Sequence, residues 1–123
     1  MMLGVGGTEV VYAQEEVAEP KVVIIEVVKK EKTIEEKIRE VFHEEPNRAV
    51  AIAKCESNLN PNAVNTANRN GTTDSGLMQL NSVHDARLNA LGLDKWDVDD
   101  NLTFARLLYE ERGFRPWVCN RLI

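Results

Sequence analysis

A run of turn-forming residues separates two helix-forming parts of this chain. Residues 58–75 hold six Asn together with Pro61 and Gly71, a composition typical of loops and turns and compatible with a small hairpin. On both sides of this segment, apolar residues recur at the three- and four-residue spacing of amphipathic helices. The sequence therefore predicts a mainly α-helical domain with one small irregular or β-like insert.

Two helices are predicted before the insert. Thr33 and Glu36 have the spacing of a capping box, which marks a helix start. Pro46 ends this first helix, because the residue before a proline disfavours α geometry, and it suits the first turn of the next helix. The second helix runs to about Ser57. The apolar face of the first helix consists of Ile34, Ile38, Val41 and Phe42.

Two more helices are predicted after the insert, and each ends at a glycine that can take the left-handed conformation common after a helix. A Ser, Asp or Asn side chain is available to cap each start. Their ranges and boundary residues are 83–91, between Ser82 and Gly92, and 102–112, between Asp100 or Asn101 and Gly113.

The composition limits the class of protein. A chain of 123 residues holds one domain with room for tails. Its net charge is −5, without a dense Lys/Arg run, which argues against a nucleic-acid-binding surface. No apolar run approaches the length needed to cross a bilayer, so we expect no stable membrane span. We also expect the protein to be a monomer.

The chain before the predicted helices divides in two. The sequence VVYA resembles a signal-peptidase site, and we interpret residues 1–13 as a signal-peptide remnant, with a disordered start as the alternative. Residues 14–32 have the mixed charge of a linker. Within them VVIIEVV, residues 22–28, can form a brief strand, or a strand that pairs with something absent from the chain. The folded domain is expected to be 33–123.

The two cysteines, Cys55 and Cys119, are 64 positions apart. An even count fits one disulfide in an exported protein, and the signal-like start indicates the same compartment. Closing a loop of about 65 residues stabilises a fold by about 4 kcal/mol in the chain-entropy model. We predict this disulfide, with two buried thiols in a cytosolic protein as the alternative.

Glu56 is the candidate general acid. It follows Ala49, Ile52 and Ala53 at helical spacing, so it shares their inward face. Burial and the negative end of the helix dipole both disfavour its carboxylate and raise its pKa. A carboxyl that stays protonated near neutral pH can donate a proton in catalysis. The alternative is an ordinary, half-exposed Glu in the last turn.

A second carboxylate, Asp74, lies in a polar turn, where it should stay ionised. Two carboxyl groups in contrasting environments are what glycosidic cleavage uses, one as proton donor and one facing the oxocarbenium-like centre. Gly76 permits close backbone approach, and Gln79 can both donate to and accept from a sugar. The alternative for Asp74 is a residue that only stabilises its own turn.

Two separated motifs resemble a known family. ESNLNPNAV at 56–64, followed by GLMQL at 76–80, is similar to the soluble lytic transglycosylase (SLT) domain, and residues 101–117 resemble that family's closing helix. ESNLN, NRN and TDSGLMQLNS also resemble animal-type (c-type) lysozyme, which shares the superfamily fold. The likeness spans about residues 33–119 and implies a lysozyme-like α-helical fold.

The resemblance also implies roles for individual residues. Glu56 would be the general acid and base, and Ser57 would orient it. Asp74 matches the second carboxylate of lysozyme, which the transglycosylases usually lack, whereas Pro61 and the Ala-Val pair after it favour the transglycosylase. Residues expected to line or approach the saccharide groove are Gly76, Met78, Gln79 and Tyr109.

Other chemistry-bearing residues have plainer interpretations. His84 is read as a helix-surface residue, and Trp96 and Trp117 as core residues rather than sugar platforms. No His, Cys or Asp set has metal-ligand spacing, so we expect no metal and no cofactor. Asp97, Asp99 and Asp100 are read as helix-capping acids.

Together these observations predict a secreted or cell-envelope enzyme whose partner is the peptidoglycan glycan strand. The expected reaction is cleavage of the β-1,4 bond between N-acetylmuramic acid and N-acetylglucosamine. Transglycosylation with Glu56 is the first hypothesis, and hydrolysis with Glu56 and Asp74 is the alternative. A non-catalytic glycan-binding or structural domain is the hypothesis from another class.

Overall fold

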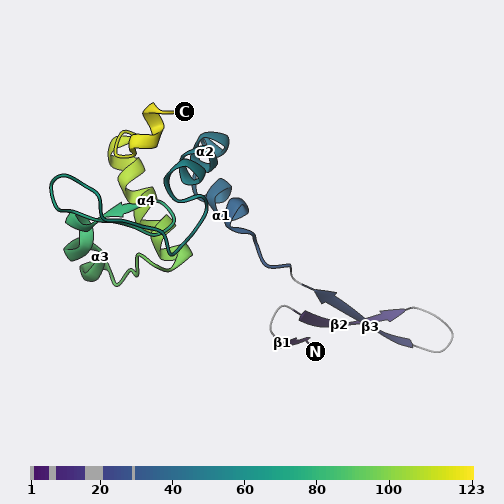
Figure 1. Ribbon diagram of the computed structural model, residues 1–123. Helices are drawn as coiled ribbons and strands as arrows, with labels where there is room; N and C mark the ends of the chain where they lie inside the picture. The colour runs from purple at the N-terminus through teal and green to yellow at the C-terminus, as the bar shows by residue number, and fades with distance from the viewer. Residues whose placement is uncertain (1, 6–7, 16–20, 29) are drawn as a thin grey trace. The chain divides into compact units, whose positions relative to one another are not determined.

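A computed structural model describes residues 2–5, 8–15, 21–28 and 30–123. The chain divides into two compact units, Met1–Lys32 and Thr33–Ile123 (Figure 1). Among the described residues, no helix is both long and apolar enough to cross a membrane.

The first unit is a three-stranded antiparallel sheet in the order β1-β2-β3. The β-branched run VVIIEVV lies in β3, and its partner is β2, within the chain itself, with Thr8 opposite Val28. The segment interpreted as a linker with a brief strand therefore contains the whole of an eight-residue strand. Residues 1, 6–7, 16–20 and 29 of the predicted signal remnant and linker lie outside the described residues. The strands are Met2–Val5 (β1), Thr8–Glu15 (β2) and Lys21–Val28 (β3).

The second unit is mainly α-helical with a small β insert, as predicted. Its four helices are Ile34–Val41 (α1), Pro46–Ser57 (α2), Asp85–Leu91 (α3) and Val98–Arg112 (α4). The insert holds the two-residue strands Val64–Asn65 (β4), Asp74–Ser75 (β5) and Leu80–Asn81 (β6). Two 3-10 turns follow, Ser82–His84 (η1) and Val118–Arg121 (η2).

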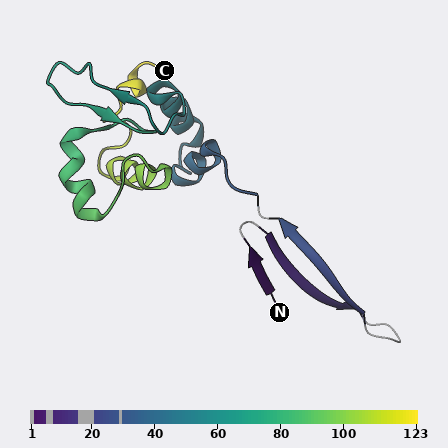
Figure 2. The same ribbon diagram turned by 60° about the horizontal axis from the view of Figure 1, so that its bottom comes forward.

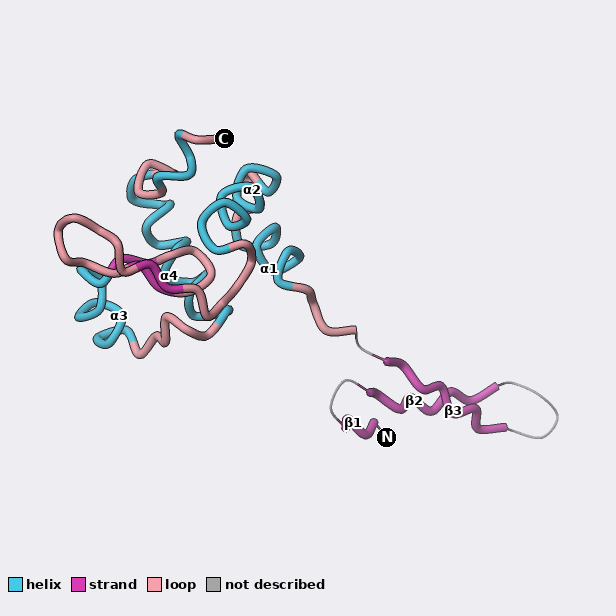
Figure 3. The backbone as a smooth tube through the Cα atoms, in the orientation of Figure 1, coloured by secondary structure: helices cyan, strands magenta, loops and turns pink. Residues whose placement is uncertain are grey.

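The small sheet and the first two helices lie on different sides of the second unit. In Figures 1 and 2 the sheet and α3 are on one side, α1 and α2 are on the other, and α4 runs between them. Most of the segment between α2 and α3 is loop (Figure 3). The buried core joins these elements, with Ile38 from α1, Ile52 from α2, Leu77 from the insert and Phe104 from α4 each fully buried.

Side-chain caps mark the starts of α1 and α4 but not those of α2 and α3. The start predicted for the third helix was wrong, because Ser82 lies in η1 and α3 begins at Asp85. Thr33 and Glu36 form the predicted capping box, and Gly92 ends α3 in the left-handed conformation. The start predicted for the last helix was wrong: α4 begins at Val98, because the Asp97 side chain accepts from the backbone of Asp100. Asn101 is instead inside α4 and fully buried.

A disulfide joins Cys55 and Cys119, whose Cα atoms are 6.0 Å apart. It links the last turn of α2 to η2, near the C-terminal end of the chain. The predicted pairing is therefore present in the structure.

Candidate active site

Glu56 lies in the last turn of α2, at the end of its buried face. Ala49, Ile52 and Ala53 are fully buried, and Glu56, on the same face, is half-buried. The helix ends directly after it, because Asn58 takes the left-handed conformation as the C-cap, which Asn tolerates better than most residues. This ending allows the chain to turn away and leaves the Glu56 carboxyl facing a cleft.

Burial raises the pKa of Glu56, and the negative charge of Asp74 raises it further. One contact acts in the opposite direction: the backbone N–H of Cys119 donates to Glu56 Oε2 at 3.3 Å, which stabilises the carboxylate and lowers the pKa. The net direction is upward. A carboxyl with a raised pKa is a proton donor at pH values where an exposed Glu is ionised.

Asp74 is held by three side-chain amides. Its Oδ2 accepts from Asn65 at 3.3 Å and from Asn68 at 3.0 Å, and its Oδ1 accepts from Asn81 at 3.0 Å. Asn65 and Asn81 are also its neighbours across the strands of the insert. Several of the Asn residues that suggested only turns therefore fix one carboxylate, whose ionised form can use every donor.

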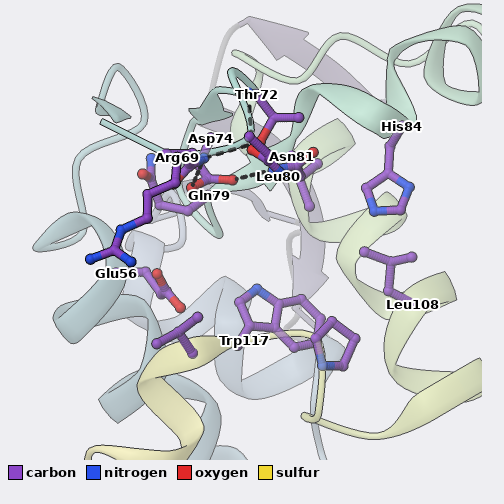
Figure 4. Close-up of a pocket in the computed structure, with 14 residues that line it drawn as sticks. Glu56, Arg69, Thr72, Asp74, Gln79, Leu80, Asn81, His84, Leu108 and Trp117 are labelled. Carbon is purple, nitrogen blue, oxygen red and sulfur yellow. Dashed lines mark hydrogen bonds between the residues drawn. The ribbon is translucent and has the colours of Figure 1, made fainter. Parts of the chain in front are cut away.

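The two carboxyl groups line one cleft of about 450 Å³. Figure 4 shows Glu56 and Trp117 on one side and Asp74, Thr72 and Asn81 on the opposite side. Gln79 lines the cleft as well. Its Nε2 donates to the carbonyls of Ala63 and Gly76, at 3.1 and 3.0 Å, so this side chain also joins the two halves of the insert.

The other residues predicted to bind the substrate do not line the cleft. Ser57 is buried, and its hydroxyl donates to the carbonyl of Ala53. Met78 is fully buried in the core. The Tyr109 ring packs edge-on against Phe42, and its hydroxyl donates to Glu45 at 3.0 Å.

Gly76 supports the cleft through its backbone. Its φ angle is 80°, which lies in the left-handed region. A Cβ atom here would lie 2.4 Å from the carbonyl oxygen of Lys95 and 2.5 Å from Asn101 Nδ2. Gly76 therefore permits a close approach between chain segments, and not directly the approach of a sugar.

Two buried side chains hold the loop that follows Gly76. Asn101 Oδ1 accepts from the N–H of Met78 at 3.0 Å, and its Nδ2 donates to the carbonyl of Lys95 at 2.9 Å. Trp117 Nε1 donates to the carbonyl of Met78 at 2.8 Å. Trp117 is a core residue, as predicted, but it also lines the cleft. Trp96 is 42% exposed, so its assignment to the core was wrong.

The sequence did not indicate several of the lining residues. His84 lies at the cleft with its ring 5.3 Å from that of Phe104, and burial lowers its pKa, which favours the neutral imidazole. Arg69 is an exposed cation on the same lining. The cysteine pairing was the signal that could have placed Trp117, because it brings the residues before Cys119 next to Glu56.

No cluster of His, Cys, Asp and Glu suited to a metal ion is present among the residues that the structure describes. The cleft instead offers an acid whose pKa is raised by burial, an amide-bound carboxylate, and neutral amides and hydroxyls. This set can donate a proton to a leaving oxygen and stabilise positive charge on a sugar ring.

A comparison with protein-family models identifies this domain. The family described as the transglycosylase SLT domain matches residues 33–107, more than half of the chain. The chain belongs to the SLT domain family. Its fold is accordingly the lysozyme-like, mainly α fold of that family, whose members cleave glycosidic bonds of peptidoglycan.

Curated relatives match a shorter part of the chain. The protein is 44% identical over 55 residues to "Invasion protein IagB" of Salmonella typhimurium, a match that covers 45% of this chain and 34% of the relative. It is 50% identical over 42 residues to "Protein IpgF" of Shigella flexneri, covering 34% of this chain and 27% of the relative. The chain thus spans about a third of the length of the curated relatives it matches.

Proposed function

We propose that this SLT domain is a lytic transglycosylase. It cleaves the β-1,4 bond between N-acetylmuramic acid and N-acetylglucosamine, with Glu56 as general acid and then general base. The observation that carries the proposal is the half-buried Glu56 carboxyl on the wall of a cleft, with its pKa raised by burial. Membership of the SLT family supports peptidoglycan as the substrate class.

In this reaction Glu56 first donates its proton to the glycosidic oxygen. The bond from that oxygen to C1 of the muramic sugar breaks, and positive charge develops on the ring. The Glu56 carboxylate then removes the proton of the 6-hydroxyl of the same sugar, and that oxygen bonds to C1. The product is an anhydro sugar, the glutamic acid is restored, and no water is consumed. Asp74, across the cleft, offers its negative charge to the positive ring.

Hydrolysis is the second candidate, and the position of Asp74 favours it. A second carboxylate on the same cleft can stabilise or attack C1, after which water completes the reaction. The three amides that bind Asp74 are compatible with either outcome, because both place positive charge on the sugar ring. A non-catalytic glycan-binding domain would use the same cleft without proton transfer from Glu56.

The proposed site of action is outside the cytosol. Peptidoglycan is a cell-envelope polymer, and the Cys55–Cys119 disulfide fits an oxidising compartment. We therefore propose a secreted or cell-envelope protein, acting as a monomer on glycan strands.

Clearing of purified cell walls tests the enzymatic function. We expect Glu56→Gln to lower the rate of turbidity loss by a factor of about 100 to 10,000, because the amide has no acidic proton to donate. Glu110→Gln, at an exposed position on α4, is the matched control and should clear walls at the wild-type rate. Equal clearing by wild type and Glu56→Gln, or none by either, would rule out the proposal.

Mass analysis of the released fragments separates the two reactions. Transglycosylation gives muramic ends that are one water lighter than those of hydrolysis. Fragments with only free reducing ends would reject the transglycosylase and support the hydrolase.

A further inference from the structure

Both cysteines of the disulfide are neighbours of the candidate acid, Glu56. Cys55 directly precedes Glu56 in α2, and its partner, Cys119, donates its own backbone N–H to Glu56 Oε2. The disulfide, the hydrogen bond and the chain from Cys55 to Glu56 therefore form one closed ring that includes the Glu56 carboxyl group. Cys55 is exposed, whereas Cys119 is buried.

The residues directly before Cys119 form one side of the cleft. Pro116, Trp117 and Val118, directly before Cys119, all line the cleft. The Trp117 indole donates to the Met78 carbonyl, and Arg48 of α2 donates to the Asn120 side chain at 2.8 Å. These contacts are side-chain hydrogen bonds, and the disulfide is the covalent tie between this segment and α2.

We propose that the Cys55–Cys119 disulfide is a positioning element of the active site, which holds the Cys119 N–H against Glu56. This inference rests on the proposed function only for its effect on catalysis. Its structural content, the contact between a disulfide-held N–H and the Glu56 carboxyl, stands on the geometry alone.

The physical argument concerns which form of Glu56 the N–H stabilises. A backbone donor binds the carboxylate more strongly than the neutral acid, so it opposes the effect of burial on the pKa. If the bridge opens, the backbone at Cys119 is released and the carboxylate loses this donor, while Trp117, which donates to the Met78 carbonyl, still lines the cleft with Glu56. The pKa of Glu56 should then rise further.

Other titratable or charged groups face the same cleft, and they are present in both the oxidised and the reduced protein. Asp74 from β5 raises the pKa of Glu56, and the cleft also contains Arg69 and His84. None of these three lies on η2. A change in Glu56 titration that follows the disulfide alone is therefore assigned to the contact with Cys119.

Carbon-13 NMR of the Glu56 side-chain carboxyl measures this directly. The whole protein is titrated in its oxidised form and after reduction by a dithiol, which converts the disulfide to two thiols and itself becomes a cyclic disulfide. Glu56→Gln assigns the signal. We expect a higher midpoint in the reduced protein; the same midpoint in both forms would overturn the proposal.

Paired variants isolate the N–H group. Cys119→Ser keeps the backbone N–H and Cys119→Pro removes it, both in a Cys55→Ser background. We expect both to titrate like the reduced protein, because without the bridge the N–H no longer contacts Glu56. If the Ser variant titrates like the oxidised protein and the Pro variant does not, the bridge is dispensable and the proposal is wrong.

A stability control separates positioning from general loosening. Ile38→Ala removes a fully buried side chain of α1 but touches neither the bridge nor the cleft lining, so the Glu56 midpoint should not change. Variants that fold only weakly are compared with oxidised protein in the same sucrose solution, which favours compact states. A reduced chain that cannot fold even there would show that the bridge acts on the whole fold, against the proposal.

Activity gives the functional readout. Reduction should lower kcat/KM by a factor of about 10 to 100, the range expected when a catalytic group is misplaced, and should move the alkaline limb of the pH profile to higher pH. Oxidised protein that does not cleave walls would remove the proposed function but leave the NMR test intact. Active oxidised protein with an unchanged profile after reduction would overturn only the positioning role.

Discussion

Glu56 is a carboxyl group placed where the fold favours its neutral form. Its position on the buried face of α2 was predicted from the spacing after Ala49, Ile52 and Ala53, and the structure places it there half-buried. Burial is the largest effect on its pKa, followed by the opposing N–H of Cys119 and then by the charge of Asp74. The acid therefore depends on contacts from three separate segments of the chain.

The raised pKa also predicts how Glu56 affects stability. Because the folded state binds this proton more tightly than the unfolded chain, the contribution of Glu56 is fully present at pH below its ordinary pKa of 4.5. It is lost as the pH rises through the raised pKa of the folded state. We expect Glu56→Gln to unfold at higher urea concentration than wild type at neutral pH, with the difference closing in acid. A variant less stable than wild type at neutral pH would contradict this.

Position 76 requires glycine, because the neighbouring chain segments leave no room for a Cβ atom. Gly76→Ala should lower the free energy of unfolding by at least about 2 kcal/mol, since it adds the left-handed backbone penalty to a collision with Lys95 and Asn101. Gly71→Ala is the matched control: Gly71 has a φ of 78° but nothing within 4 Å of a new Cβ. It should lose only about 1 kcal/mol. Urea unfolding of both variants measures the difference, and equal losses would rule out the steric argument.

At the scale of elements, α4 holds the insert against the helices. Asn101 projects from its first turns into the core and bonds the backbone of Met78 and Lys95. The loop that carries Gly76, Met78 and Gln79 is thus fixed by a helix that begins only at Val98.

We therefore expect Asn101→Asp to be strongly destabilising. The carboxylate can still accept from Met78, but it loses the donor to the Lys95 carbonyl and places a charge in a fully buried site. The loss of unfolding free energy should be about 3 kcal/mol or more. Asn89→Asp, exposed on α3, should change it by less than about 0.5 kcal/mol. Thermal or urea unfolding measures both, and a small effect at residue 101 would contradict the role of this side chain.

The sequence predicted elements better than it predicted contacts between them. The capping box at Thr33, the helix start at Pro46 and the glycine after α3 depend on neighbouring residues, so local patterns were sufficient. The first helix, however, ends at Val41, before the proline that was expected to end it. Asn101 was read as a cap because Asn caps helices well. Its real partners, Met78 and Lys95, are set by the tertiary fold.

The same distinction applies to the cleft. Glu56, Asp74 and Gln79 could be selected from the spacing and the family resemblance, and all three line it. His84 and Arg69 could not, because their positions depend on how the insert packs beside α4 and η2. The predicted pairing of the two cysteines was enough to bring Trp117 near Glu56, although Trp117 was read only as a core residue.

At the scale of the whole molecule, the chain consists of two units, and the buried core that the structure describes lies in the second. Among the described residues, every member of the buried core cluster lies between Ile38 and Cys119. The cleft and the disulfide also lie in the second unit. In the first unit, Val22, Ile24 and Ile25 are exposed on β3. The catalytic machinery proposed above is therefore contained in residues 33–123.

This division predicts that a protein of residues 33–123 folds and keeps the activity of the full chain. It begins at Thr33, so the capping box that starts α1 is retained, and it keeps the core and the Cys55–Cys119 bridge that restricts its unfolded state. We expect its melting temperature to lie within about 3 °C of the full-length value, a change of well under about 1 kcal/mol for a domain of this size. A protein of residues 38–123, which lacks the capping box and the first turn of α1, is the control and should melt at lower temperature. If the 33–123 protein is unfolded, or clears walls much more slowly than the full chain, then the first unit contributes to the fold or to the site.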